Sequence, residues 1–176
     1  MKRREAIQHV ALLLGGALAA PSVAGAMGQV LNTTPGLTVT PEQEALLAEV
    51  ADVIIPTTGT PGAKAAGAEK FIVRVMRDCY PKADQEAFYG GLSKLDADSK
   101  TKFGNGFMNL DKAQKIEMVK QTTTADKPFF LRMKELTTLG YFTSEIGATK
   151  ALAYLPVPGQ FDGCKPIEPG QKTWAL

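Results

Sequence analysis

Apolar side chains recur at helical spacing along this chain, and each such segment begins or ends at a recognisable helix signal. At the first segment, Thr40 is a candidate N-cap, Pro41 suits the first turn of a helix, and Gln43 completes a capping box. Pro56 ends the segment. The apolar positions between these signals fall on one helical face: Leu46, Leu47, Val50, Val53 and Ile54.

The same combination of spacing and end signals predicts further helices. The helix expected to begin at Tyr80-Pro81 should stop before residue 96. Residues 96–109 are polar and contain glycines, so they are predicted to form a loop. No stretch shows sustained alternation with period two, so we expect an all-α fold: one small domain of about five to six helices. The further helices are expected from about Lys64 to Cys79, from Tyr80-Pro81 to Leu95, from Asp111 past Val119, from Asp126 past Leu139, and from Ser144 to Tyr154.

Residues 155–176 differ in kind, because they contain four prolines and three glycines. Such a segment cannot form a helix and is expected to run extended over a surface. It also carries Phe161, Cys164 and Trp174, which a disordered tail would not need. The tail therefore either packs on its own domain or lies against a partner, and aromatic anchors such as Trp174 are enriched at interfaces.

The first 26 residues have the features of a twin-arginine export signal. Arg3 and Arg4 precede an apolar run of 11 residues, and a small-residue site, Ala-Gly-Ala, ends at Ala26. A membrane-spanning helix needs about 20 apolar residues, so cleavage after Ala26 is favoured over an uncleaved anchor, which stays the alternative. We therefore expect a signal over residues 1–26, a linker over 27–39, a helical domain over 40–176, and a periplasmic location. Membrane association through partners or through an uncleaved signal stays open.

Removal of this segment changes the charge and the available chemistry. Lys+Arg falls from 20 to 17 and Asp+Glu from 18 to 17, so the net charge of +2 becomes zero. A neutral chain without a basic cluster lacks the electrostatic features of a nucleic-acid-binding protein. The only histidine, His9, lies in the signal, which excludes histidine-dependent catalytic sites and imidazole ligands for haem or zinc in the mature chain.

Two cysteines remain, Cys79 and Cys164. Outside the cytoplasm an even cysteine count favours a disulfide between them, with Cys79 facing the core at the end of its helix. The alternative is a pair of buried free thiols. Two cysteines are too few for an iron–sulfur cluster, which normally needs four.

The remaining candidate sites do not support a catalytic, cofactor-binding or metal-binding assignment. A possible calcium loop at residues 96–100 lacks the diagnostic residues, because its sixth and twelfth positions are Thr101 and Phe107. A dinucleotide-binding turn follows a strand, whereas no strand is predicted before the glycines at 104 and 106. Four carboxylates are candidates for acid–base work, and nothing in the sequence brings two of them together: Asp52, Glu69, Asp78 and Glu145.

Residues 52–63, Asp-Val-Ile-Ile-Pro-Thr-Thr-Gly-Thr-Pro-Gly-Ala, resemble the gluconate 2-dehydrogenase subunit 3 family. Residues 40–43, 140–147 and 158–164 and the Arg3-Arg4 leader are similar to the same family. The resemblance implies a non-catalytic subunit, without a cofactor of its own, beside a large FAD-containing subunit of the glucose-methanol-choline type. A cytochrome c subunit, carrying haem c, is often a further partner. The large subunit can cross the membrane bound to the small one, and the substrates are sugars, sugar acids or polyols.

Three functional hypotheses follow. The first is an accessory subunit, not itself an enzyme, that escorts its flavoprotein partner through the twin-arginine translocase. The second is a stand-alone periplasmic carbohydrate-binding or scaffold domain that uses aromatic residues of the tail. The third, an enzyme, rests only on the carboxylates. For a partner interface we expect the loop residues Pro56, Thr57 and Pro61 and the tail residues Phe161 and Trp174.

Overall fold

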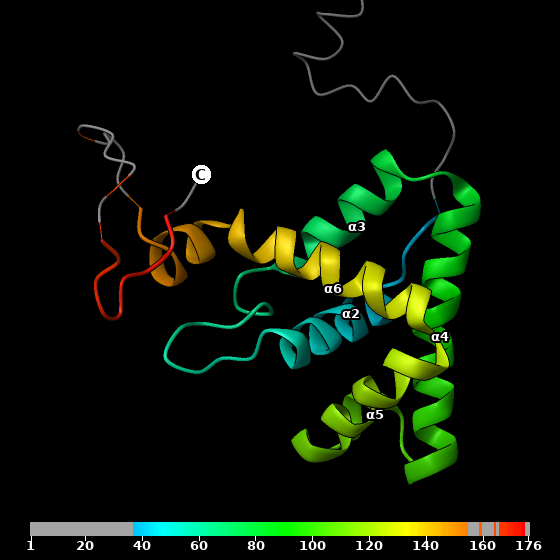
Figure 1. Ribbon diagram of the computed structural model, residues 1–176. Coiled ribbons are helices and arrows are strands. Elements are labelled where there is room, and N and C mark those ends of the chain that lie inside the picture. The colour runs from blue at the N-terminus through cyan, green and yellow to red at the C-terminus, as the bar shows by residue number, and fades with distance from the viewer. Residues whose placement is uncertain (1–36, 155–158, 160–163, 165, 175–176) are drawn as a thin grey trace, which may run out of the picture. The chain divides into compact units, whose positions relative to one another are not determined.

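The computed structural model describes residues 37–154, 159, 164 and 166–174. Within these ranges the chain forms five α-helices, a 3-10 turn and a π-helical turn, and no strand, which confirms the predicted all-α fold (Figure 1). No helix among these residues is both long and apolar enough to cross a membrane. The elements are α2 (Pro41–Ile54), α3 (Ala68–Cys79), α4 (Lys82–Phe103), η1 (Phe107–Asn109), α5 (Lys112–Ala125), α6 (Lys127–Phe142) and η2 (Gly147–Ala151).

The starts of α2, α5 and α6 are capped by side chains, as the residues at these positions suggest. Gln43 N donates to Thr40 Oγ1 at 3.2 Å, and Thr40 N donates to the Gln43 side chain at 3.0 Å, so the predicted capping box forms. Asp111 forms the same reciprocal arrangement with Gln114 at the start of α5. Asp126 caps α6 by accepting from the backbone of Phe129. Each cap gives a hydrogen-bond partner to a backbone N–H that has none within its helix.

Helix α4 continues to Phe103 rather than ending near Leu95, so the predicted loop over residues 96–109 is wrong for its first eight positions. The polar residues there occupy the solvent side of a helix whose buried side continues through Leu95 and Ser99. Ser99 is fully buried, and its hydroxyl donates to the Leu95 carbonyl at 2.7 Å. The helix stops at Gly104, whose φ of 76° is the left-handed conformation typical of a C-terminal glycine.

Two other predicted boundaries also shift. Helix α3 begins at Ala68, after Gly67 with φ 70°, and residues 64–67 form a turn. The predicted sixth helix is reduced to residues 145–146 and the π-helical turn η2. The backbone turns at Gly67 before α3 and at residues 143–144 after α6, and apolar spacing alone does not reveal such turns.

Helix α6 is the element on which the others assemble. It contacts each of the other four helices, and in Figure 1 it crosses in front of α2 and α3. Its side chains Met133, Leu136 and Tyr141 are almost fully buried. They meet Leu47 of α2 and Ile72 of α3, which have no exposed surface. Burial of apolar area on this scale is the main stabilising contribution to such a fold.

Close approach of α6 to two neighbours depends on glycine. A Cβ added at Gly91 of α4 would lie 2.6–2.8 Å from the Cγ, Cδ2 and Cβ atoms of Phe129. A Cβ added at Gly140 of α6 would lie 2.9 Å from the Phe71 ring. The contact at Gly91 falls on the root of the phenylalanine side chain, which cannot turn aside as a flexible chain end can.

Adjacent glycines of α4 provide a matched test of this packing. We expect Gly91→Ala to reduce the free energy of unfolding by about 1–3 kcal/mol, because the new methyl group overlaps Phe129. Gly90→Ala faces open space and should raise it by up to about 1 kcal/mol through helix propensity. Urea denaturation followed by circular dichroism measures both values. Equal effects of the two substitutions would contradict the proposed packing.

Candidate partner interface

The loop over residues 56–62, between α2 and α3, is closed at its base by its own hydrogen bonds. The Gly62 amide donates to Thr57 Oγ1 at 2.9 Å, and the Ala63 amide donates to the Ile55 carbonyl at 2.8 Å. Proline and threonine at these positions suit a fixed turn. The loop therefore has a defined shape of its own.

Gly62 is required at the base of this loop. A Cβ there would lie 2.6 Å from the Thr57 amide nitrogen, 2.7 Å from Asp52 Oδ1 and 2.8 Å from the Ile55 carbonyl oxygen. Two of these three contacts are to backbone, so no side-chain rearrangement makes room. The candidate carboxylate Asp52 thus lies against the base of the loop.

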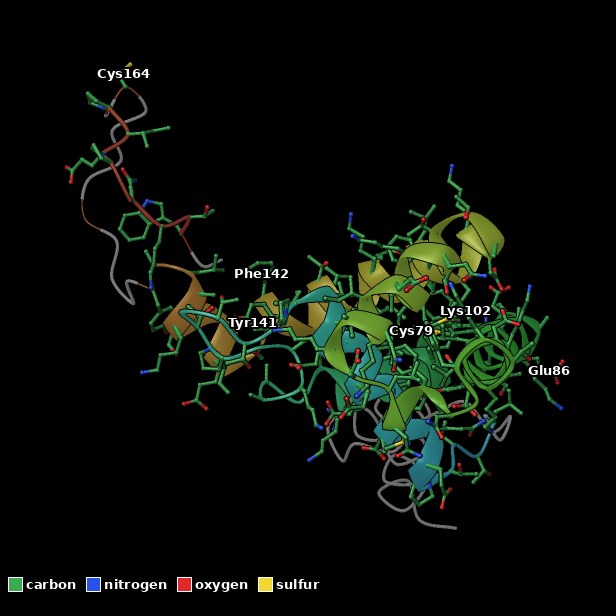
Figure 2. The ribbon with its side chains drawn as sticks, turned by 90° about the horizontal axis from the view of Figure 1, so that it is seen from below. Cys79, Glu86, Lys102, Tyr141, Phe142 and Cys164 are labelled. Carbon is green, nitrogen blue, oxygen red and sulfur yellow. The ribbon has the colours of Figure 1, made fainter. Side chains whose placement is uncertain are left out.

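Tyr141, near the end of α6, joins that helix to the loop. Its hydroxyl donates to the Pro61 carbonyl at 2.7 Å and lies 3.5 Å from Thr60 Oγ1. The Tyr141 side chain is 2% exposed, so the bond is sheltered from water. Residues 52–63 and 140–147, far apart in sequence, meet at this bond, and Figure 2 shows Tyr141 and Phe142 beside the loop.

The chain turns tightly just after α6. The Ser144 hydroxyl donates to the Tyr141 carbonyl at 2.6 Å and accepts from the Gly147 amide at 3.0 Å. A Cβ at Gly147 would overlap the Tyr141 carbonyl, so only glycine fits. This turn brings η2 back toward the loop.

The last described residues of the tail, 172–174, contact the domain beside η2. The Ala153 amide donates to the Thr173 carbonyl at 2.8 Å, within an isolated parallel bridge between Ala153 and Trp174. Lys172 Nζ donates to the Lys150 carbonyl at 2.6 Å. These contacts place residues 172–174 beside η2.

Between these elements lies a groove of about 470 Å³, which we call the loop–tail groove. Its walls come from the end of α2, the loop, the end of α6, η2 and the tail. Large apolar side chains are exposed at this end of the domain: Leu139 is 48% exposed, Phe142 39%, Tyr154 57% and Trp174 54%. A group of exposed apolar residues beside a groove is typical of a protein-binding surface. The lining residues are Ile54, Ile55, Pro56, Thr58, Thr60, Tyr141, Phe142, Ala151, Leu152 and Thr173.

Of the five predicted interface residues, the structure places four near this groove. Pro56 lines it, Thr57 is exposed next to Pro56, and Pro61 binds Tyr141. Trp174 follows the lining residue Thr173. Phe161 lies outside the described residues, as do Arg3 and Arg4. Sequence reasoning did not single out Tyr141 and Phe142, although both belong to the quoted segment 140–147.

The charged groups beside the loop form a small network on its other side. Glu49 of α2 pairs with Lys64 at 2.5 Å and with Lys115 of α5 at 2.6 Å. Partial burial acts to raise the pKa of Glu49, but the hydrogen bonds from the two lysines outweigh it and lower that pKa overall. The pairs join α2, the turn after the loop and α5, which is a structural role.

Asp78 and Glu145, two other candidate carboxylates, have separate surroundings. Asp78 pairs with Arg77 at 2.7 Å, and the hydrogen bond from that guanidinium lowers the pKa of Asp78. Glu145 is exposed. Residues 96–100, considered as a calcium loop, lie within α4. Across the part of the chain that the structure describes, no group of three or more His, Cys, Asp or Glu side chains is placed to hold a metal ion.

The structure contains no disulfide between Cys79 and Cys164, in contrast to the bridge predicted from the cysteine count. The expectation that Cys79 faces the core is also wrong, because Cys79 is exposed. The buried side of α3 consists of Ala68, Ile72 and Met76. Cys79 is the last residue of that helix, beyond the neighbours that cover the apolar side.

Comparison with known proteins identifies one family. The family model described as gluconate 2-dehydrogenase subunit 3 matches residues 41–159, which include both segments joined by Tyr141. Neither curated proteins nor solved structures give a significant match.

Replacement of Tyr141 tests the connection between α6 and the loop. We expect Tyr141→Phe to lower the free energy of unfolding by about 1–3 kcal/mol, because the Pro61 carbonyl loses its buried donor. Amide hydrogen exchange at residues 57–63 should also become faster. Tyr80→Phe, which removes a hydroxyl bonded to Arg132 instead, is the control and should leave exchange in the loop unchanged. Unchanged exchange in the Tyr141 variant would contradict the connection.

Proposed function

Because the chain belongs to the gluconate 2-dehydrogenase subunit 3 family, we propose that it is the non-catalytic small subunit that assembles with, and helps to export, the flavoprotein of a periplasmic dehydrogenase complex. Family membership by itself makes the chain an accessory subunit of a dehydrogenase complex. The proposal adds a large FAD-containing partner of the glucose-methanol-choline type that acts on sugars or sugar acids. A cytochrome c with haem c is proposed as a further partner.

The observation that carries the proposal is the preformed apolar end of the domain. Two segments that resemble the family converge there through the Tyr141–Pro61 hydrogen bond, and Phe142 and Trp174 lie exposed beside the loop–tail groove. A surface whose shape is fixed before binding loses little conformational freedom when a partner docks. Exposed aromatic side chains supply the contacts that dominate protein interfaces.

The export part of the proposal is supported by the sequence. The twin-arginine route, as a class, carries proteins that have already folded, and Arg3-Arg4 followed by a short apolar run has the features of its signal. After residue 26 the sequence contains no histidine, so the mature chain cannot use imidazole for catalysis or metal binding. A folded-protein signal on such a chain is well explained by a folded, cofactor-bearing partner.

A second candidate function is a stand-alone carbohydrate-binding or scaffold domain. It is favoured by Tyr154 and Trp174, two exposed aromatic residues at the bridge between η2 and the tail, because aromatic rings can stack on sugar rings. Calorimetric titration of the isolated chain with a sugar or sugar acid separates the two functions. Measurable affinity without a flavoprotein would favour the second.

Replacement of the leader arginines tests the escort function. We expect Arg3→Lys together with Arg4→Lys to retain both this chain and the flavoprotein in the cytoplasm, because the partner travels on this chain's signal. Cell fractionation with flavin absorbance and immunoblotting measures both proteins. The control is the conservative change Lys2→Arg, which keeps the arginine pair and should leave export unchanged. A flavoprotein that still reaches the periplasm in the double variant would contradict the escort function.

Truncation of the exposed aromatic residues tests the proposed interface. We expect Phe142→Ala and Trp174→Ala each to weaken binding to the flavoprotein by about tenfold or more, since buried aromatic anchors contribute about 2 kcal/mol or more. Met108→Ala is the matched control, because Met108 is 45% exposed and lies in η1, outside the residues that line the loop–tail groove. Co-purification yield and surface plasmon resonance measure the effect. Equal losses in all three variants would contradict the assignment of this end as the interface.

A further inference from the structure

A cavity of about 310 Å³ opens near the start of α6, away from the loop–tail groove. There the first turns of α6 lie beside α4 and the end of α3 (Figure 1). Phe129 of α6 lines this cavity, whereas Phe142, about 20 Å farther along the same helix, lines the groove. We call the cavity the Arg132 pocket, after another of its lining residues. Its volume is at the lower end of the range for small-ligand sites.

The floor of the Arg132 pocket is apolar and preformed. Phe88 and Phe129 make a tilted ring pair with centroids 5.4 Å apart, and Met76 and Pro128 extend the apolar lining. Phe129 is held in place because its side chain packs closely against Gly91 of α4. A floor that is already in place before binding loses little conformational freedom when a ligand enters.

One wall of the pocket is a guanidinium group that is already engaged. The Arg132 guanidinium carbon lies 4.6 Å from the centroid of the Tyr80 ring, and Arg132 Nη1 donates to the Tyr80 hydroxyl at 2.7 Å. The same nitrogen donates to Glu135 Oε2 at 3.0 Å. Glu135 therefore offsets the positive charge of Arg132 within the domain.

Two carboxylates in the pocket have no such cation. Asp84, in the first turn of α4, and Asp126, the N-cap of α6, both line it, and neither pairs with a cation among the described residues. Each helix N-terminus contributes a partial charge of about +0.5, which offsets about half of one carboxylate. With Arg132 neutralised by Glu135, the pocket keeps a net negative charge of about one.

A negative pocket with an aromatic floor favours a cation, and its lining favours a guanidinium group. A guanidinium is planar and weakly hydrated, stacks on aromatic rings and forms paired hydrogen bonds with carboxylates. An ammonium group is compact and more strongly hydrated, so it gains less from the same surroundings. An alkyl stem attached to the guanidinium would lie along Pro128 and Phe129. Arg132 stacked on Tyr80 already shows this kind of contact at the pocket wall.

We propose that the Arg132 pocket binds a guanidinium group on an alkyl stem, with the charged head at Asp84 and Asp126 and the stem on the apolar floor. An arginine side chain of another polypeptide and a free guanidino compound both carry this group. The site is separate from the loop–tail groove, and its binding is measured on the purified full chain alone. Failure of this inference therefore leaves the proposed accessory function untouched.

Titration with small probes, followed by amide chemical shifts in the ¹⁵N-labelled chain, tests the ligand class. N-acetyl-L-arginine amide should shift the amide resonances of residues 84 and 126–132. The control is N-acetyl-L-citrulline amide, which has nearly the same shape without the charge and should bind at least about tenfold more weakly. Equal binding of the two probes, or no shift at these amides with the arginine probe, overturns the inference. Binding of butyrate at the same amides overturns it too, because the pocket would then select an anion.

A third probe, n-butylguanidinium, distinguishes the two sources of the group. Tighter binding of the arginine amide supports an arginine residue of a polypeptide, because the flanking amide groups then contribute. Tighter binding of n-butylguanidinium supports a free guanidino compound. Either result requires the charged head and the stem.

Paired substitutions test the position of the site. Asp126→Asn keeps a good N-cap while removing the charge, and with Asp84→Asn it should weaken binding of the arginine probe by about threefold or more in each variant. The control Asp98→Asn removes a charge from the same helix as Asp84, outside the pocket, and should leave binding unchanged. Ala87→Leu should block the pocket, whereas Ala83→Leu, exposed outside the lining, should not.

Circular dichroism of all five variants checks that each retains its helices. Equal losses in the Asp84, Asp126 and Asp98 variants would show a general charge effect rather than a site, and would overturn the inference. Undiminished binding in the Ala87→Leu variant would place the ligand elsewhere and overturn it as well.

Discussion

The hydrogen bond from the Tyr141 hydroxyl to the Pro61 carbonyl is the interaction on which the candidate interface depends. It joins the end of α6, the helix that contacts all the others, to a loop that would otherwise be held only at its base. Because the Tyr141 side chain is buried, the bond is shielded from competing water. The groove exists because these two elements are held at a fixed separation.

Glycines decide whether that arrangement can form. Because Gly62 has no side chain, the base of the loop can lie against Asp52. In the same way, Gly140 allows Phe71 to pack against α6, and Gly147 allows the turn that returns η2 to the loop. At each position a methyl group would overlap atoms of a neighbour. The same end of the domain then carries the tail, whose bridge to Ala153 completes the groove. The loop–tail groove is thus assembled from the end of α2 with its loop, the end of α6, η2 and the tail.

This construction suits an accessory subunit. A partner that docks on a preformed end meets aromatic side chains already in place, which limits the entropy lost on binding. At the other end of α2, the Leu37 amide donates a hydrogen bond to the buried Gln85 side chain and fixes the start of the domain.

The sequence by itself determined what depends on near neighbours along the chain: the all-α class, the capping box at Thr40, the helix start at Asp111, and the turn residues of the loop at 56–62. These features come from local spacing and from side chains that bond their own backbone. Tertiary structure decided that Tyr141 reaches Pro61, that residues 96–103 stay helical through buried Ser99, and that Cys79 is exposed. Those outcomes depend on which surfaces the packed helices cover. Tyr141 and Pro61 are 80 positions apart along the chain, and no local sequence pattern indicates that they make contact.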